Sequence, residues 1–554
     1  MTLRSISMKL QDLPVLHRSF LKIFMSAALA MLAVGLLFGL ATALIRTGYA
    51  ETEAVTGYRM MTAHGVTVFF YWLYFAQMAF LLALAAAQLP GAPRIALLPL
   101  AWAGFLSMLV GFMASQVGTF WGSPLLYDGS PELVGDNTWQ AAAFYAGYVL
   151  LSAGLFMLSA SAIATTLGAK RNGQAREWST IGFAVTAWSG LVMVSSIATL
   201  NTFLPAMAWT LGWSEIPAAH ETGWHLLFHN LHYLPLMGTV IVWYALVNDI
   251  TGVSSIFGQR FSKAIFTLYL IFVPPTSLYH MFLDPNLSPF LRGLGSLLSL
   301  FISVPTIAVF LVIVMSLEAH ARAKGASGLF GWLKSLPWHE PAIAAIGWSI
   351  VNLALGGIFA FVLIQEKLAP MLSDTFFVPA YFHFLTIGTV SLTLLGALSW
   401  AMPLLFGRKP VAERLLAVLP VTLTIGLALF GVGGMAAGLS GMPRRVLGAA
   451  YDGAAPQLWS NMSPWIAGGA VIMALSLIAY VAVLVTTALA DSRANLREYP
   501  VPHSDIDAVA VFSQRAWTAP VAVALLVAGM YAATYIAFAI IRSLPVIASA
   551  ASGH

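Results

Sequence analysis

Six histidines lie inside segments of the chain that are otherwise apolar, and these side chains are the ones best suited to do chemistry there. An ionisable side chain at membrane depth costs free energy and is by default a candidate for function, although a lone one also serves as a hydrogen bond between helices. Almost no carboxylate or cation accompanies them, so we expect neutral imidazole rings, and neutral imidazole is a metal ligand. The six are His64, His225, His229, His232, His280 and His383.

The available ligand types narrow the choice of metal. The chain contains no cysteine, which excludes disulfides, iron–sulfur clusters, thiolate zinc sites and a cysteine-ligated dicopper site. Intramembrane carboxylates are few as well, and an all-nitrogen ligand set favours haem iron or copper. Zinc is compatible with imidazole ligands, but it gives no reason for so many apolar segments.

Three of the histidines share one face of a predicted helix. His225, His229 and His232 are spaced i, i+4 and i+7, and side chains at this spacing lie above one another on a helix. That face can offer two or three nitrogens to one metal ion, and the alternative is a polar stripe along a water-filled cavity. Tyr233 follows His229 by four residues, one turn on, where it can donate a proton or an electron to a molecule bound at the metal.

The next apolar segment brings a tyrosine and a histidine together after two prolines. Tyr279 and His280 follow Pro274 and Pro275. Proline frees backbone carbonyls that lipid cannot satisfy, so such a break favours a helix that lines a cofactor or a cavity. A tolerated kink is the alternative.

A second segment of this kind carries Tyr381 and His383 after Pro379. Residues 381 and 383 are separated by about 200° around a helix, so the two side chains must face different neighbours. One helix can therefore serve two cofactors. His64 has no local partner and is expected to ligate a metal together with a distant residue.

Two adjacent arginines, Arg444 and Arg445, follow Pro443 in a predicted loop. Arginine holds carboxylates in a bidentate manner. Haem propionates would explain the pair, and an ordinary loop pair is the alternative.

The composition indicates which elements hold these residues. The chain has 554 residues, of which 59% are apolar and 8% are charged, whereas soluble domains have roughly 45–50% and 25%. We therefore predict an all-α, polytopic membrane protein, which excludes a soluble enzyme, a secreted disulfide scaffold and a disordered hub. The net charge of +5 is typical of basic loops in a membrane protein and does not indicate nucleic-acid binding.

Segments of roughly 20 apolar residues mark the membrane spans. We count about 13, and we divide the chain into a cytoplasmic tail (1–22), a single membrane-embedded haem-binding domain (23–546) and a C-terminal tail (547–554). The spans are centred near residues 33, 75, 106, 153, 190, 236, 272, 303, 353, 389, 426, 476 and 531.

The basic residues predict the orientation of the bundle. If successive connections alternate between the two sides, 19 of the 26 lysines and arginines fall on the side of the N-terminus. Cytoplasmic loops carry the excess of positive charge. We therefore expect a cytoplasmic N-terminus, an external C-terminus and a location in the bacterial cytoplasmic (inner) membrane.

Taken in order, these motifs resemble the haem–copper oxidase superfamily, catalytic subunit I, and specifically its B-type branch. The resemblance extends from His64 through the last predicted helix. Its motifs are His229-x-x-x-Tyr233, the proline-rich approach to His280, Ser316-Leu-Glu318 followed by Gly328-Leu-Phe-Gly-Trp332, Pro379-x-x-x-His383 and Pro443-Arg444-Arg445.

The resemblance implies roles for the haem-binding residues. His64 and His383 match the two axial ligands of the low-spin haem, which is expected to be of b type. Arg444 and Arg445 match the pair that holds haem propionates.

It also implies roles around a copper ion. His229 matches the first copper ligand, and Tyr233 matches the tyrosine that is cross-linked to it. His280 matches one of two adjacent copper ligands on the following helix. Tyr244 and Thr306 resemble members of the family's single proton-uptake route.

This chain departs from the family pattern at two positions. The family has His-His where this chain has Tyr279-His280, and it has His-Phe-His where this chain has Tyr381-Phe-His383. The resemblance therefore implies that one copper ligand and the proximal histidine of the high-spin haem are each replaced by tyrosine.

Three explanations of these departures stay open. Tyr381 ligates a second haem as tyrosinate, as tyrosine does in catalase, while His225 or His232 supplies the lost copper nitrogen. Alternatively, the site holds a different metal arrangement. In the third case the second haem and the copper are lost.

The leading functional hypothesis is a membrane oxidoreductase at the end of a respiratory chain, similar to cytochrome c oxidase. Electrons pass a low-spin haem on His64 and His383 and reach a modified metal site that reduces a diatomic gas, with dioxygen as the expected substrate. Tyr233, Tyr279 and Tyr381 are the candidate catalytic residues.

Three other hypotheses are weighed against it. The first is nitric oxide reduction or dismutation, which the lack of glutamate in the centres of the sixth and seventh spans disfavours. The second is a catalytically silent electron-transfer or structural subunit, which predicts one haem and no copper. The third is a transporter with a histidine-lined pathway.

The resemblance also implies partners. Because this chain lacks cysteine, the family's dicopper electron-acceptor site, where it is used, belongs to a separate subunit II-like chain. A cytochrome or another redox donor supplies that subunit. We expect contacts with membrane lipid and none with nucleic acid.

Overall fold

The computed structural model describes ten stretches of the chain, and within them the side chains of residues 169, 221–222, 225–229, 292 and 296 fall outside the description. The stretches are residues 6–89, 91–122, 124–136, 138–171, 178–253, 256–275, 288–365, 367–448, 453–490 and 518–543.

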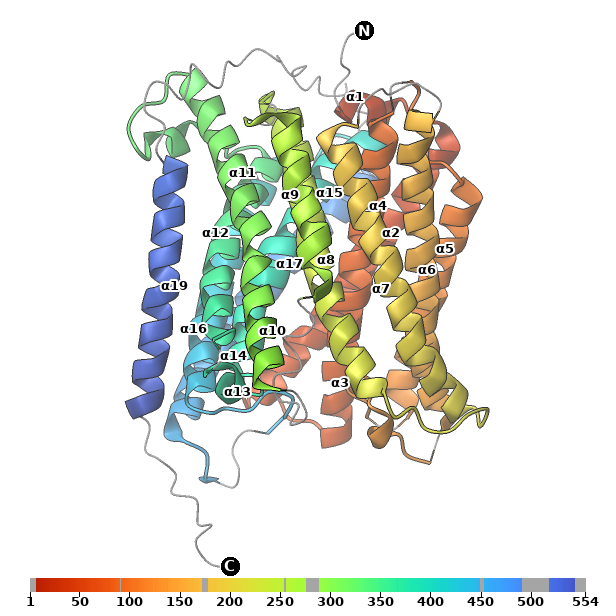
Figure 1. Cartoon of the computed structure of the whole chain (residues 1–554), viewed down its shortest axis with the longest axis vertical. Helices are drawn as coiled ribbons and strands as arrows, with labels where there is room; N and C mark the ends of the chain where they lie inside the picture. The colour runs from red at the N-terminus through yellow and green to blue at the C-terminus, as the bar shows by residue number, and fades with distance from the viewer. Residues whose placement is uncertain are drawn as a thin grey trace, which may run out of the picture.

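The described residues form a bundle of long helices without a β-strand (Figure 1). In this part of the chain, 12 helices are long and apolar enough to cross a membrane, which confirms the predicted all-α membrane fold. The spans are α2 (Val15–Arg46), α3–η1–α4 (Ala54–Ala87), α5 (Leu98–Trp121), α6 (Thr138–Arg171), α7 (Thr180–Thr210), α8 (His220–Thr251), α10–α11 (Pro289–Ala323), α12 (Pro341–Leu363), α14–η5–α15 (Phe377–Phe406), α16 (Glu413–Leu439), α17 (Gln457–Leu489) and α19 (Thr518–Ser543).

The span predicted near residue 272 is the one that the count of 12 does not include. Helix α9 (Gly258–Phe272) occupies this position and has 15 residues. Pro274 and Pro275 follow its end, and residues 276–287 lie outside the described part of the chain. The remaining twelve predicted centres each fall inside an observed span.

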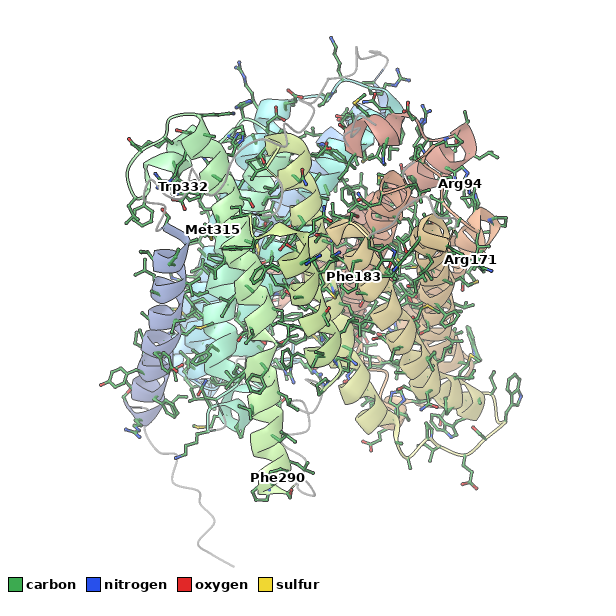
Figure 2. All side chains as sticks on the ribbon, turned by 45° about the horizontal axis from the view of Figure 1, so that its top comes forward. Arg94, Arg171, Phe183, Phe290, Met315 and Trp332 are labelled. Carbon is green, nitrogen blue, oxygen red and sulfur yellow. The ribbon has the colours of Figure 1, made fainter. Side chains whose placement is uncertain are left out.

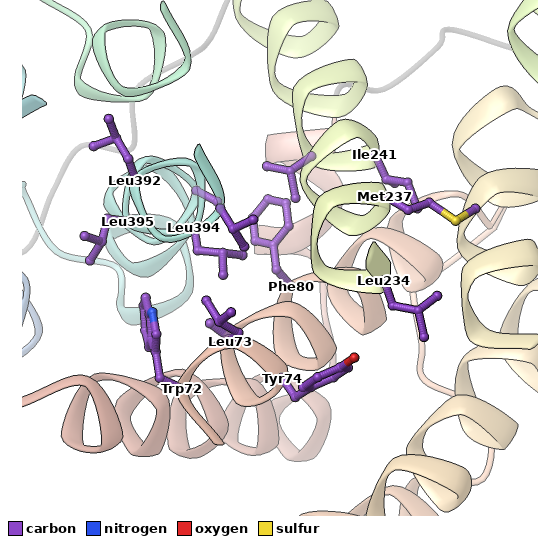
Figure 3. Packing of buried hydrophobic residues seen from close by; sticks show 14 of the residues in the cluster. Trp72, Leu73, Tyr74, Phe80, Leu234, Met237, Ile241, Leu392, Leu394 and Leu395 are labelled. Carbon is purple, nitrogen blue, oxygen red and sulfur yellow. The ribbon is translucent and has the colours of Figure 1, made fainter. Parts of the chain in front are cut away.

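Three spans form the centre of the bundle and are almost entirely buried: α3–η1–α4, α8 and α14–η5–α15. Figure 3 shows apolar side chains from these spans, including Leu73, Leu234 and Leu394, which belong to one buried cluster. Hydrogen bonds also join these spans, because Trp72 Nε1 donates to Ser391 Oγ at 2.9 Å and Tyr74 Oη donates to the Leu231 carbonyl at 2.9 Å. The same three spans carry most of the candidate ligands, so those residues belong to the most deeply buried part of the fold.

Two of the central spans contain a π-helical stretch at an equivalent place. Helix α3 (Ala54–Gly65) ends one residue after His64 and is followed by the π-helix η1 (Val66–Trp72). Helix α14 (Phe377–His383) ends at His383 and is followed by the π-helix η5 (Phe384–Ser391). π-helical segments are rare, and they are frequent at functional sites.

Two prolines in the predicted spans, Pro305 and Pro379, lie close to observed breaks between helices. Helix α10 (Pro289–Phe301) and helix α11 (Ser303–Ala323) are separated at Ile302, just before Pro305. Pro379 lies in the first turn of α14, after the short helix α13 (Ala369–Leu372). Both breaks adjoin the cavity described below.

The two ends of the described chain lie at opposite ends of the bundle. Helix α1 (Ile6–Gln11) contacts α4, α8 and α15, and the Ile6 amide donates to Asp249 Oδ1 at 2.7 Å. Helix α19 ends at the far side (Figure 1). Figure 2 shows Arg94 and Arg171 near the same end as Trp332, away from Phe290. Which side of the membrane the α1 end faces stays a prediction.

Candidate cofactor site

A cavity of about 530 Å³ lies between the central spans and the helices around them. Apolar side chains make up most of its wall. The candidate residues that line it are His64, His232, Tyr233, Tyr381, His383, Arg444 and Arg445. We call this cavity the chamber.

His64 and His383 face each other in the chamber, although 319 positions separate them in the sequence. Their ring centroids lie 6.5 Å apart and their planes differ by 13°. A metal–imidazole bond of about 2 Å on each side, plus the distance from each nitrogen to its ring centre, adds up to roughly 6 Å. The spacing therefore suits one metal ion held between the two rings.

The backbone selects the ring nitrogen that is available to such a metal. His64 Nδ1 lies 2.9 Å from the Gly35 carbonyl oxygen, and His383 Nδ1 lies 2.6 Å from the Pro379 carbonyl oxygen. A carbonyl only accepts, so each Nδ1 carries the proton and each Nε2 keeps its lone pair. A second hydrogen bond of this kind is the usual way in which a metal-ligating histidine is oriented.

Small residues on α2 let the His64 helix approach. Gly35 and Gly39 form a Gly-x-x-x-Gly pattern, which allows close contact of helices in membranes. A Cβ atom built on Gly39 would lie 2.5 Å from Cε1 of His64, and one built on Gly35 would overlap Val68. The His64 ring therefore rests on the α2 backbone, with no space for a larger residue at position 39.

A similar contact holds the His383 helix. Gly431, Gly434 and Gly438 follow one face of α16, and a Cβ on each would meet Phe384, Ala380 and Phe377, respectively. Helix α14 thus lies directly on the α16 backbone. The Phe430 ring, with its centroid 4.8 Å from that of His383, limits how far the imidazole can turn.

The two arginines form one wall of the chamber, and neighbouring loops orient them. Arg444 makes an ion pair with Asp374 at 3.0 Å. Arg445 pairs with Asp128 at 3.1 Å and donates to the Tyr127 hydroxyl at 2.8 Å. Burial alone would lower the pKa of the Arg445 guanidinium, but Tyr127 and Asp128 outweigh this effect and raise the pKa.

The backbone around the arginines is constrained. Arg445 has a φ of 61°, in the left-handed region that non-glycine residues rarely adopt. Arg46 of α2 donates to the carbonyls of Pro443 and Val446 on either side of the pair, and its guanidinium lies 4.4 Å from the centroid of the Phe376 ring. A strained backbone that surrounding contacts enforce is typical of functional sites.

A second part of the chamber contains Tyr233 and Tyr381 together with Thr306 of α11. Tyr381 makes ring contacts with Phe377 and Phe382, at centroid distances of 6.0 Å and 6.3 Å. His383 and Tyr381, both of α14, line the same cavity, and the predicted service of two cofactors by this one helix stays a prediction.

His232 lies between the helices that carry the paired histidines. Its ring centroid is 4.1 Å from that of Phe69 and 4.9 Å from that of Phe382. The side chains of His225 and His229 lie outside the described set, as do Tyr279 and His280. Within the described residues, no group of three or more histidine, aspartate or glutamate side chains forms a metal site.

Sequence reasoning did not identify several residues that support the site. The Gly35–Gly39 spacing is a recognisable signal, because small residues four apart mark close helix contacts. Tyr127, Asp128 and Arg46 carry no comparable pattern, since each acts through contacts with residues hundreds of positions away.

Comparison with known proteins defines the class of protein. A solved cryo-EM structure of a haem–copper terminal oxidase dimer superimposes with a TM-score of 0.80 at 20% identity, covering 94% of this chain and 93% of that chain. A curated cytochrome c oxidase subunit 1 of Thermus thermophilus is 28% identical over 463 residues, covering 81% of this chain and 79% of the relative. Another from this organism is 33% identical over 104 residues, covering 18% of this chain and 95% of that sequence.

The family model described as cytochrome c and quinol oxidase polypeptide I matches residues 19–475. The chain therefore belongs to this family, the subunit I family of the haem–copper oxidases. The family normally binds haems and copper and works together with other subunits.

The residues around His64 and His383 fit a haem. They supply two opposed Nε2 lone pairs, and two guanidinium groups lie in the wall of the same cavity. Because Gly39 has no side chain, the His64 ring can lie directly against α2. The fit of copper depends on His229 and His280, which lie outside the described side chains.

Proposed function

We propose that this chain is the catalytic subunit of a membrane respiratory oxidase and that its substrate is dioxygen. The observation that carries the proposal is the opposed pair His64 and His383 in a chamber that also contains Tyr233 and Tyr381. Membership of the family supports the class of reaction.

His64 and His383 are the proposed axial ligands of a low-spin haem of b type, and Arg444 and Arg445 are the proposed partners of its propionates. When bound, the haem supplies one-electron transfer. The chain holds both imidazoles as neutral acceptors through the Gly35 and Pro379 carbonyls. The guanidinium groups of Arg444 and Arg445 would pair with the haem propionates, whose carboxylates would otherwise have no positively charged partner in the cavity.

The second part of the chamber is the proposed place of gas reduction. Tyr381 is the proposed ligand of a second, high-spin haem, and Tyr233 the proposed hydrogen donor to the bound gas. Both line the chamber. The proposed copper ligands are His229 and His280, with His225 or His232. Tyr279 occupies the position at which the family has another histidine copper ligand. The apolar wall excludes bulk water and strengthens every polar contact inside.

Electrons are proposed to come from a separate subunit II-like chain, supplied by a cytochrome or another redox donor. The chain has no cysteine for a dicopper centre of its own. The bacterial cytoplasmic membrane, with α1 on the cytoplasmic side, is the proposed location. The excess of basic residues at that end supports this orientation.

Haem and metal stoichiometry of the purified complex tests the proposal, together with reduced-minus-oxidised spectra, carbon monoxide difference spectra, and dioxygen and nitric oxide consumption. We expect two haems and one copper per chain, a carbon-monoxide-binding species and dioxygen consumption. Nitric oxide consumption without dioxygen consumption would show that the substrate is nitric oxide and not dioxygen. One low-spin haem, no copper and no response to carbon monoxide would overturn the catalytic role.

The Tyr381→Phe variant tests the proposed second ligand. It should change or abolish the high-spin signal and leave the low-spin signal intact, because the proposed low-spin ligands His64 and His383 are both kept. Tyr480→Phe is the matched control, since Tyr480 is fully buried and its hydroxyl donates to the Leu416 carbonyl, away from the chamber. A high-spin spectrum unchanged in Tyr381→Phe would exclude ligation by Tyr381.

A further inference from the structure

Helix α8 contains a proline immediately after two of the candidate residues, His232 and Tyr233. Pro235 lies inside the helix and has no backbone N–H group, so the carbonyl of Leu231, four residues earlier, loses its partner within the helix. At membrane depth such a carbonyl has no bulk water to accept from and needs a donor from a neighbouring helix. The course of α8 at this point therefore depends on side chains of other helices.

Buried side chains of two neighbouring helices supply donors to this part of α8. From α4 (Leu73–Ala87), the Tyr74 hydroxyl donates to the Leu231 carbonyl at 2.9 Å. From α7, Trp188 Nε1 donates to the Leu234 carbonyl at 2.7 Å. Tyr74 and Trp188 are both 0% exposed. Figure 3 shows the Tyr74 side chain extending from α4 towards Leu234 of α8.

A third donor engages the proline itself. Gln77, three residues after Tyr74 on α4, donates from Nε2 to the Pro235 carbonyl. A Cβ atom built on Gly238 would lie 2.7 Å from this nitrogen, so the absence of a side chain at position 238 lets Gln77 approach. We call Tyr74, Gln77 and Trp188 the clamp.

The clamp holds a segment of α8 that forms part of the chamber wall. His232 and Tyr233 line the chamber, and the three clamp side chains are not part of its lining. The His232 ring also packs against Phe69, at a centroid distance of 4.1 Å. Phe69 and Tyr74 belong to the span of His64. That span therefore contacts this segment twice, through the His232 ring and through the backbone just before it.

The same arrangement occurs in α16, away from the chamber. Pro420 lies inside α16 and frees the carbonyl of Leu416, four residues earlier. The Tyr480 hydroxyl of α17 donates to that carbonyl at 3.1 Å, and Tyr480 is 0% exposed. None of these three residues lines the chamber. The two tyrosines thus make the same kind of bond for the same reason, and they differ in what the proline-containing helix carries.

We propose that Tyr74 is a positioning residue for gas reduction. Its hydrogen bond to α8 sets the place at which this helix presents His232 and Tyr233, relative to the helix that carries His64. Tyr74 acts only through α8, and no proton or electron passes through it. The inference rests on the proposed function, in which Tyr233 is the hydrogen donor to the bound gas. A misplacement of about 1 Å at a reacting group can cost roughly 100-fold in rate.

The test uses the complete membrane complex and the variant Tyr74→Phe, which removes the hydroxyl and keeps the ring. The infrared band of carbon monoxide bound to the reduced complex is measured, because it responds to the groups around the bound gas. We expect this band to shift or split and kcat for dioxygen to fall by about tenfold. The low-spin haem spectrum should be unchanged.

Tyr480→Phe is the matched control, since it removes the equivalent bond in α16. Both variants should lower the thermal midpoint of the complex, but Tyr480→Phe should keep the parental carbon monoxide band and kcat. A loss of stability alone therefore cannot produce the expected difference between the two variants.

Gln77→Met is a second variant of the clamp, and it decides the question if Tyr74→Phe does not assemble. It keeps the length of the side chain and removes its N–H donors, so we expect the same shift of the band. A parental band and kcat in the clamp variants would overturn the positioning role while leaving the proposed function intact. A parent complex that binds no carbon monoxide would instead overturn the proposed function on which this role rests.

Discussion

At the scale of single residues, the backbone determines which nitrogen of each histidine faces the chamber. The Gly35 and Pro379 carbonyls each engage an Nδ1 atom, so in both histidines Nε2 is the nitrogen left for a metal ion. The role of these two carbonyls could not be predicted from the sequence. The histidines could be predicted as functional residues, because an ionisable side chain in an apolar segment costs free energy and is by default a candidate for function.

Replacing either paired histidine tests this arrangement. We expect His64→Ala and His383→Ala each to abolish the low-spin haem spectrum, because one remaining imidazole leaves the opposite side of the metal without its ligand. Reduced-minus-oxidised spectra measure the effect. His339→Ala is the control, since the His339 side chain is 78% exposed. A low-spin spectrum that survives in both variants would contradict the ligand assignment.

The residues that sequence reasoning did not find are those that act at long range. Arg46 of α2 holds the loop of Arg444 and Arg445 through backbone carbonyls, and Asp128 holds Arg445 from another loop. Because every residue has a backbone carbonyl, the sequence does not show which carbonyls accept these hydrogen bonds. Only the fold reveals that Arg46, 400 positions before Val446, supports the same wall of the chamber.

At the scale of helices, hydropathy predicted the 12 spans found in the described residues and one more near residue 272, where α9 has only 15 residues. The π-helical stretches were not predictable, because one extra residue in a turn leaves the hydropathy of η1 and η5 unchanged. The contact between α14 and α16 was not identified either, although Gly434 and Gly438 are four residues apart, as Gly35 and Gly39 are, and such spacing marks close helix contacts. The spacing does not say which helix makes the contact.

The α14–α16 contact can be tested with one methyl group. A Cβ at Gly438 would overlap the backbone nitrogen of Phe377, and backbone cannot move aside as a flexible side chain can. We expect Gly438→Ala to destabilise the protein by about 1–3 kcal/mol, the usual cost of overpacking, and to loosen His383.

Thermal loss of the haem absorbance measures this effect. Gly468→Ala is the matched control, because Gly468 lies in the interior of α17 and a methyl group added there would have no neighbouring atom within 4 Å. Equal midpoints for the two variants would mean that the contact does not support the site.

At the scale of the whole molecule, the basic residues at the α1 end predict the orientation in the membrane. The absence of cysteine makes this testable, since any cysteine introduced is the only one in the chain. Met8 lies in α1 and Glu132 lies in the loop between α5 and α6, at the opposite end, and both side chains are exposed.

We expect a membrane-impermeant maleimide to label Glu132→Cys in intact cells and Met8→Cys only after the cells are opened. Labelling of both variants in opened cells is the control for accessibility. Labelling of Met8→Cys in intact cells would reverse the predicted orientation and would place the arginine wall of the chamber on the cytoplasmic side.

The two π-helical stretches also affect how this protein tolerates insertions and deletions. Each adds a residue to a turn directly after a paired histidine, so loss of one residue from η1 or η5 would restore a regular helix. Because the extra residue is accommodated within the π-helical turn, such a deletion would leave the helix on both sides in its present orientation, and the hydrogen bond between Trp72 and Ser391 would keep its alignment. The same deletion in an α-helical part of either span would turn everything beyond it by about 100°. Single-residue deletions should therefore be tolerated better in η1 and η5 than elsewhere in these two central spans.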